Sequence, residues 1–164
     1  MCVDVRQMSL AALPRSAGYR CSWLVPIILC CSGPWVKPQP PVGPKITTGH
    51  LGIIFKTVDE AALAACAYVR KNKPMATEYE YCGVIYRDVE GIKAGLPMTD
   101  EKATRCERPL EPPGTTPEAG YHNHLQTSEF SSYDRRLITP LALYLCTPSG
   151  LVKKRTPEGT VIVK

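Results

Sequence analysis

The chain has few histidines, no long hydrophobic run and no closely spaced cysteine pair outside its first part. Three histidines occur among 164 residues. The longest apolar stretch, residues 21–31 (CSWLVPIILCC), is too short to cross a bilayer as a helix. The cysteines after this stretch show no Cys-x-x-Cys spacing, which excludes a zinc knuckle and a thioredoxin-like redox motif; they are Cys66, Cys82, Cys106 and Cys146.

The charge of the chain is unevenly distributed. The formal net charge is +5. Residues 1–50 carry five Lys/Arg and one Asp, whereas residues 51–164 carry fifteen Lys/Arg and fourteen Asp/Glu. The later residues therefore lack the basic excess that binds a polyanion, so we expect no nucleic-acid partner. Hydrophobic and charged fractions of 44% and 21% are typical of a globular protein, and the length suits one domain.

The first part of the chain predicts an exported protein. Three arginines precede the apolar run, as in a secretory signal, and a cysteine at the end of such a run would also suit a lipid anchor. Membrane contact is expected only through this leader. The alternatives are a buried strand or a start at Met8, which would leave the protein in the cytoplasm. We therefore divide the chain into a leader (1–33), a proline-rich linker (34–49) and a folded domain (50–164).

The order of predicted elements indicates a single α+β (mixed α/β) domain. Thr57 and Glu60 form a capping box, and the alanine-rich residues that follow predict a helix with one apolar face, stopped by Pro74. The remaining pattern predicts a strand over 77–88, a long loop over 89–118 and a strand over 119–124. A helix over 131–143, short or broken at Pro140, and two or three terminal strands follow.

The four later cysteines leave two alternatives open. They would make two disulfides in an oxidising compartment. Cys66 and Cys82 would also fit the pattern as small, buried, reduced side chains.

Two of the histidines stand one residue apart on a predicted strand. His122 and His124 would project from the same face, about 7 Å apart, and would share one zinc ion with Asp134 in the first turn of the next helix. Three protein ligands leave a position for water, as in catalytic zinc sites. The alternatives are surface histidines and an Asp134 that only caps its helix behind Ser131. The His-Asn-His tripeptide is not the dispersed motif of HNH nucleases.

An acidic pair on the strand over 77–88 supplies a candidate general base. Glu78 and Glu80 share a face of an otherwise apolar strand in EYEYCGVIY. We expect Glu78 to be a solvated strand end. Glu80 lies deeper and would take a proton from a zinc-bound water and pass it to a leaving amine.

These motifs together resemble those of the JAMM (Jab/MPN) zinc metallopeptidases. The residues concerned are Glu80 with Gly83 three later, then His122-x-His124, then Ser131-x-x-Asp134. The FSSYD and YLCTPSGLV stretches look most like a bacterial branch known as domain of unknown function 4329, often found in toxins and short secreted proteins. The resemblance covers about residues 50–160.

The resemblance implies a fold and a set of roles. The fold would be a curved mixed β-sheet flanked by helices, of the JAMM/cytidine-deaminase-like kind. His122, His124 and Asp134 would bind Zn²⁺, Glu80 would act as general acid and base, and Ser131 would donate a hydrogen bond to the oxyanion. Two departures are Leu125, where active members usually carry proline, and a spacer from His124 to Asp134 that is one residue shorter.

The sequence therefore predicts a zinc-dependent hydrolase that cleaves a peptide or amide bond in a peptide or protein substrate, and we expect it to be a secreted or toxin-associated effector. The alternative is a catalytically inactive module of the same fold that binds a peptide or protein partner. A nucleobase deaminase is disfavoured, because its His-x-Glu and Pro-Cys-x-x-Cys signature is absent. The oligomeric state is left open.

Overall fold

The computed structural model describes residues 43–136 and 141–163. The predicted leader (1–33) and the first part of the predicted linker (34–42) lie outside the described residues. The described residues belong to one compact unit. Within the described ranges, no helix has the length and apolar character needed to cross a membrane.

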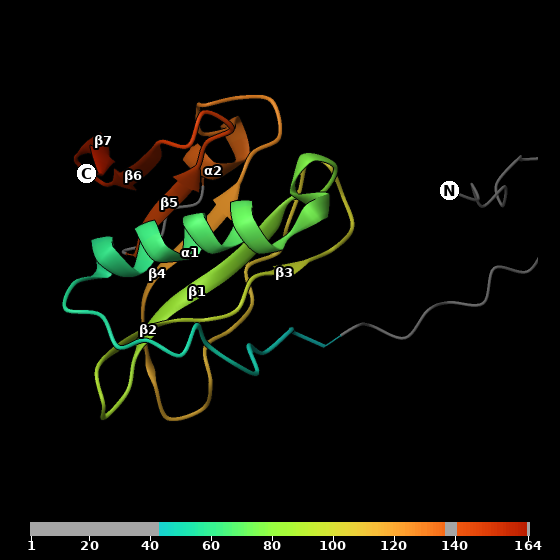
Figure 1. Ribbon diagram of the computed structural model, residues 1–164. Helices are drawn as coiled ribbons and strands as arrows, with labels where there is room; N and C mark the ends of the chain where they lie inside the picture. Colours follow the sequence, from blue (N-terminus) through green and yellow to red (C-terminus); the bar gives the residue numbers. More distant parts are fainter. Residues whose placement is uncertain (1–42, 137–140, 164) are drawn as a thin grey trace, which may run out of the picture. The chain divides into compact units, whose positions relative to one another are not determined.

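A seven-stranded mixed sheet forms the centre of the domain (Figure 1). The strand order is β2-β1-β4-β5-β6-β7, with the short β3 also paired to β1; β4 and β5 are parallel and the other pairs antiparallel. This confirms the predicted α+β class. The strands are β1 Tyr81–Arg87, β2 Ile92–Ala94, β3 Met98–Thr99, β4 Thr116–Asn123, β5 Ala142–Cys146, β6 Val152–Thr156 and β7 Gly159–Val163.

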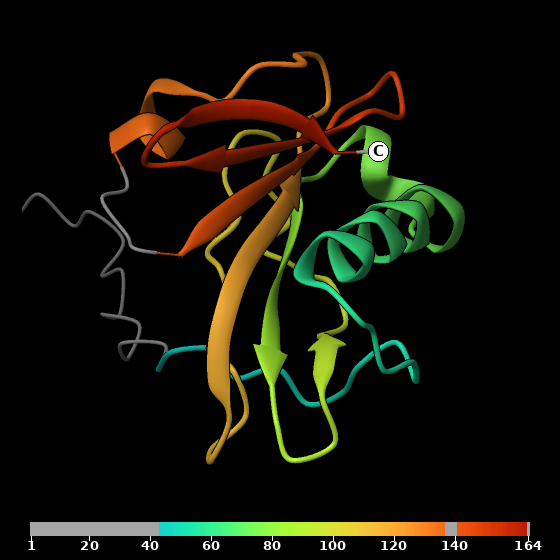
Figure 2. The ribbon, with the colours of Figure 1, turned by 90° about the vertical axis from the view of Figure 1, so that its left-hand side faces the viewer.

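The two helices lie on opposite sides of this sheet. Helix α1 (Val58–Asn72) covers one side, and the short helix α2 (Ser132–Arg136) lies on the other (Figure 2). The predicted cap of α1 is present, because the Thr57 side chain accepts a hydrogen bond from Glu60 N at 3.1 Å. The Glu60 carboxylate reaches one residue further back than a capping box requires and accepts from Lys56 N at 3.0 Å.

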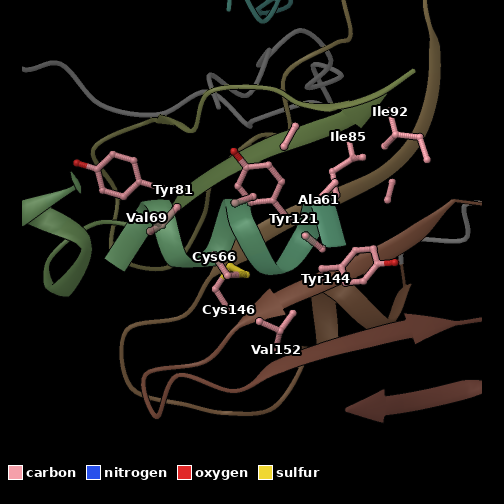
Figure 3. Packing of buried hydrophobic residues seen from close by; sticks show 14 residues of the cluster. Ala61, Cys66, Val69, Tyr81, Ile85, Ile92, Tyr121, Tyr144, Cys146 and Val152 are labelled. Atoms are coloured by element: carbon pink, nitrogen blue, oxygen red, sulfur yellow. A yellow bond between two sulfur atoms is a disulfide. The ribbon is translucent and has the colours of Figure 1, made fainter. Parts of the chain in front are cut away.

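The apolar core lies between α1 and the sheet (Figure 3). The predicted apolar face of α1 is buried there, where small alanine side chains let the helix approach large tyrosines on the strands. The residues of the core include Ala61, Ala62, Ala65, Cys66, Val69, Tyr81, Ile85, Tyr121, Tyr144 and Val152. Every second residue of β1 and β4 therefore faces α1, and the residues between them face the other side of the sheet.

Two disulfides hold this arrangement. Cys66–Cys146 joins α1 to β5 and lies in the core (Figure 3). Cys82–Cys106 joins β1 to the loop that follows β3, on the face away from α1. The sequence left open whether these cysteines form disulfides or are reduced and buried, and in the structure all four are in disulfides.

Gly83 is required by the packing of β1 against β4. In the β1–β4 register Gly83 pairs with Tyr121, whose ring lies over the glycine. A Cβ atom at residue 83 would be 2.3 Å from Tyr121 Cζ. The ring is 1% exposed and its hydroxyl donates to Gly95 O at 2.7 Å, so it is not free to move aside.

The segment between α1 and β1 differs from the prediction. Residues Pro74–Thr77 form a 3-10 turn, and β1 begins only at Tyr81. Glu78 is therefore an exposed residue at the end of this turn and not a strand residue on the face of Glu80. The reason is tertiary: the chain must reverse between α1 and β1, and Asn123 fixes the reversal by accepting from Tyr81 N at 2.6 Å and donating to Ala76 O at 3.0 Å.

Three other segments also differ from the prediction. The expected loop over 89–118 contains β2, β3 and the start of β4, which pair with β1 or its partners despite weak strand patterns. The helix expected over 131–143, short or broken at Pro140, is short and ends at Arg136 among the described residues. The difference lies at its far end, where residues from Ala142 form β5 because they pair in parallel with β4. Residues 45–49, expected at the end of the linker, already pair with the domain through Thr47 N to Leu110 O at 3.0 Å. His50, the first residue of the predicted domain, forms a bridge with Gly95.

Candidate metal centre

Strand β4 places both histidines on the sheet face opposite α1. His122 lies in β4, and His124 continues the extended backbone one residue past its end, where its N–H lies 3.4 Å from Cys146 O of β5. The alternation of the strand puts both rings on one side and Asn123 on the other, as predicted. The two Nε2 atoms are 3.1 Å apart, and each residue is 7% exposed.

Helix α2 brings Asp134 to the same point. Asp134 Oδ1 lies 3.5 Å from His122 Nε2, and Oδ2 lies 3.4 Å from His124 Nε2. Asp134 is buried, with 6% exposure. The structure thus brings together all three ligands that the sequence predicted, and their candidate ligand atoms lie within 4.8 Å of one another.

The separations of these atoms suit a single metal ion. Tetrahedral zinc with ligand distances of about 2.0–2.1 Å needs ligand atoms roughly 3.3 Å apart. The three closest distances between the residues, 3.1, 3.4 and 3.5 Å, bracket this value. The two Nε2 atoms either share a proton in a hydrogen bond or, when both ring protons are on Nδ1, present two lone pairs that a cation between them would bind. The buried group is therefore able to bind a metal ion.

The electrostatics of the group favour a cation. Burial raises the pKa of the Asp134 carboxyl, but hydrogen bonds from His122 and His124 outweigh burial and hold it well below its usual range. Burial alone would lower the pKa of His124, but the hydrogen bond to Asp134 and the nearby Glu80 raise it. The charged Asp134 carboxylate is in the state that binds a metal ion. The His124 imidazole reaches that state when it loses its proton, which a metal ion displaces.

Ser131 and its neighbours hold Asp134 in place. The Ser131 N–H and hydroxyl both donate to Asp134 Oδ2 at 2.7 Å, and Asp134 N donates to Ser131 Oγ at 3.1 Å. Arg155 of β6 donates to the backbone carbonyls of Asp134 and Arg135, which fixes the end of α2 against the sheet. Phe130, 4% exposed, packs edge-on against the His122 ring at a centroid distance of 6.4 Å.

This arrangement changes the role expected of Ser131. The sequence predicted a donor for a substrate oxyanion, and the structure shows a hydroxyl already directed at Asp134. Ser131 does line the same cavity as the histidines, so its position agrees with the prediction although its hydrogen bond does not.

Glu80 lies next to the group of His122, His124 and Asp134 without joining it. Cys82 pairs with His122 in the antiparallel β1–β4 register, so continuing the register by two residues places Glu80 opposite His124 on the same face. Glu80 is 8% exposed, and its carboxylate makes no hydrogen bond or ion pair with the residues that the structure describes. Burial raises the pKa of Glu80 to about 7, partly opposed by His124 and supported by the negative charge of Asp134.

A cavity of about 760 Å³ opens onto the three ligands and Glu80. Its walls include residues that sequence reasoning did not identify, above all the loop with Arg105 and Arg108 and the side chains of Tyr133 and Leu143. No local pattern marks these residues, because the loop is held at the site by partners distant in sequence, among them Cys82 of β1 through the Cys82–Cys106 disulfide. The sequence signal that could have linked this loop to the site is Cys82, two residues after Glu80, because its disulfide partner Cys106 lies in the loop.

Comparisons with family models, with curated proteins and with solved structures find no match to this chain. The resemblance to JAMM metallopeptidases therefore stays a hypothesis based on the motif residues.

Proposed function

We propose that the protein is a zinc-dependent hydrolase that cleaves a peptide or amide bond. One observation carries this proposal: a buried carboxylate without a hydrogen-bond partner among the described residues, Glu80, lies opposite His124 in the same cavity as a His-His-Asp group. A purely structural metal site has no use for such a carboxylate, whose burial is costly. The JAMM-like fold and roles belong to this proposal.

Zinc is the proposed metal because of the donor set. Two imidazoles and one carboxylate are the ligands of many catalytic zinc sites, and three protein ligands leave one position open. The same donors also suit ferrous iron in oxygenases. Glu80 favours zinc and hydrolysis, since a neighbouring base is the residue that hydrolytic chemistry needs. A bound zinc ion would supply Lewis acidity and acidify a water molecule in the open position.

The residues of the chain divide the remaining work. His122, His124 and Asp134 hold the metal, and the capping hydrogen bonds of Ser131 orient Asp134. Glu80 accepts the proton of the attacking water and then returns it to the leaving amine. A pKa of about 7 suits both steps, because a group that takes and gives a proton works best when its pKa is close to the working pH.

The runner-up is a module of the same fold that binds a peptide or protein partner without cleaving it. The hydrogen bond from Ser131 to Asp134 favours this alternative, because it leaves no free Ser131 donor for an oxyanion. The two disulfides support an exported protein, since such bonds persist in oxidising compartments. Peptide or protein substrates remain the proposed partners.

The proposal is tested by zinc content and turnover of the full chain. We expect about one zinc per chain, lost in the His122→Ala/His124→Ala double variant. His50→Ala is the matched control, because the third histidine is exposed and its ring makes only one hydrogen bond with the described residues, which it accepts from Gly52 N. Full zinc content in the double variant would refute the ligand assignment.

Turnover separates the hydrolase from the binding module. A peptide library is first screened for zinc-dependent cleavage. Glu80→Gln should keep zinc and lower turnover about 10²–10⁴-fold, the usual loss of a general acid–base group, whereas Glu78→Gln on the exposed turn should have little effect. Equal cleavage by Glu80→Gln and the unmodified chain would refute the mechanism. Binding of a peptide that is never cut would favour the alternative.

A further inference from the structure

The loop between β3 and β4 places two arginines in the cavity that contains the metal-binding group. Arg105 and Arg108 both line this cavity, and both side chains are exposed. Neither guanidinium forms a hydrogen bond or ion pair with any residue in the described ranges. Elsewhere in the same ranges, Arg87 and Arg155 are engaged, with Glu118 and with the backbone of α2.

The backbone around these arginines is anchored at several points. Cys106 is bonded to Cys82 of β1, and Glu107 N donates to Asp100 Oδ2 at 2.7 Å. Asp100 is in turn paired with Lys45, and Pro109 is fully buried. The loop therefore holds its arginines at the cavity before a ligand arrives. It loses less conformational entropy when a ligand binds than a free loop would.

Gly120 positions Arg108 relative to the metal-binding group. A Cβ atom at residue 120 would lie 2.9 Å from Arg108 Cδ, so the aliphatic part of this arginine rests on the bare backbone of β4. Gly120 is two residues before His122 on the same strand face, which corresponds to about 7 Å. Two residues of an extended peptide span the same distance.

The charges of the cavity leave a place for an anion beside the two arginines. Glu80 and Asp134 lie with the histidines, and the exposed Glu107, between the two arginines in the chain, also lines the cavity, so one carboxylate faces two guanidinium groups there. Leu125, Ala142 and Leu143 line the wall as apolar residues. The cavity thus joins a metal-binding end to a guanidinium end, and guanidinium groups favour carboxylates because they can form paired hydrogen bonds.

We propose that Arg105 and Arg108 form a subsite that binds a carboxylate of the substrate within about two residues of the bond to be cleaved. This inference rests on the proposed hydrolase function, because it names the substrate class of the same cavity. The carboxylate belongs to the C-terminus of a short peptide or to an acidic side chain beside the scissile bond. Both sources present the same chemistry to the arginines.

Binding of three uncleaved probes by calorimetry tests the subsite. The probes are N-acetyl-Leu-Ala-Leu as the free acid, its C-terminal amide, and N-acetyl-Leu-Asp-Leu amide, each titrated into the full chain carrying Glu80→Gln. We expect the free acid, the acidic-side-chain amide or both to bind about tenfold more tightly than the uncharged amide, as for a hydrogen bond to a charged group. The probe that binds tightly identifies the source of the carboxylate.

The arginine variants give the controls. Arg108→Ala should abolish the preference for a carboxylate, and Arg108→Lys should keep part of it. Arg70→Ala, on the exposed face of α1, should leave the preference unchanged. Equal binding of the three probes, or binding of none, overturns the subsite even if zinc-dependent cleavage is found. A preference that depends on Arg108 in a chain without zinc or cleavage would support the subsite and refute the hydrolase.

Discussion

Ser131 and Asp134 hydrogen-bond to each other in both directions at the start of α2. Asp134 N donates to Ser131 Oγ at 3.1 Å, and the Ser131 N–H donates to Asp134 Oδ2 at 2.7 Å. This is a capping box with aspartate in place of the usual glutamate. The same carboxylate lies within 3.5 Å of both histidine Nε2 atoms, so the cap of the helix also sets the position of a candidate metal ligand.

Replacing Ser131 with alanine should therefore weaken metal binding. Ser131→Ala removes the cap of a five-residue helix and a partner of the Asp134 carboxylate, and partners of this kind change metal affinity about 10–100-fold. Zinc affinity is measured by competition with a chelator, and Ser132→Ala in the first helical position is the control. Unchanged affinity combined with lower turnover would instead assign Ser131 to the oxyanion.

Stability without zinc should depend on pH through Glu80. Burial raises the Glu80 pKa from its ordinary 4.5 to about 7, so folding favours the protonated carboxyl. Its contribution to stability is complete below pH 4.5 and is lost as pH rises through about 7. Asp134, whose pKa is lowered, contributes a constant amount over this window because it is ionised in both states.

The measurement compares urea unfolding of the zinc-free chain with that of Glu80→Gln at pH 5 and pH 8. The unmodified chain should lose stability relative to the variant as the pH rises, because glutamine stays neutral. The His124 pKa is also raised, partly by Glu80, so its contribution has the same sign in both proteins but is smaller in the variant. A difference between the two proteins that does not change with pH would show that Glu80 is not buried as described.

Gly83→Ala should destabilise the domain without removing a ligand. The new methyl group would lie 2.3 Å from the buried Tyr121 ring, and overpacking of this kind costs about 1–3 kcal/mol. Thermal unfolding measures the loss of stability. Gly114→Ala is the control for backbone strain without overpacking, because a Cβ atom there meets no atom within 4 Å but the backbone φ of 82° is unfavourable for alanine. A variant as stable as the unmodified chain would contradict the ring position.

The two disulfides should differ in what their removal changes. Cys66→Ala/Cys146→Ala breaks the link between α1 and β5 across 80 residues and should lower the free energy of unfolding by about 2–4 kcal/mol. Cys82→Ala/Cys106→Ala releases the loop of Arg105 and should mainly weaken carboxylate binding. Calorimetric unfolding and probe titration of both variants check this, and the reverse pattern would contradict it.

The sequence by itself determined the elements whose signals are local. Helix α1 followed from its cap and apolar face, and the α+β class followed from the order of elements. The candidate metal ligands also followed from local patterns, because alternation on a strand sets the faces of His122 and His124, and Asp134 opens a helix three residues after Ser131.

Only the tertiary structure decided the features that depend on partners distant in sequence. Glu78 lies outside the predicted strand because Asn123, over forty residues later, fixes the chain reversal before β1 by hydrogen bonds. The helix predicted over 131–143 was expected to be short or broken at Pro140, but the strand β5 from Ala142 onward depends on its parallel pairing with β4, which local helix propensity does not reveal. The loop with Arg105 and Arg108 reaches the cavity through the Cys82–Cys106 disulfide, and a cysteine pairing cannot be read from spacing, because it depends on which strands the fold brings together.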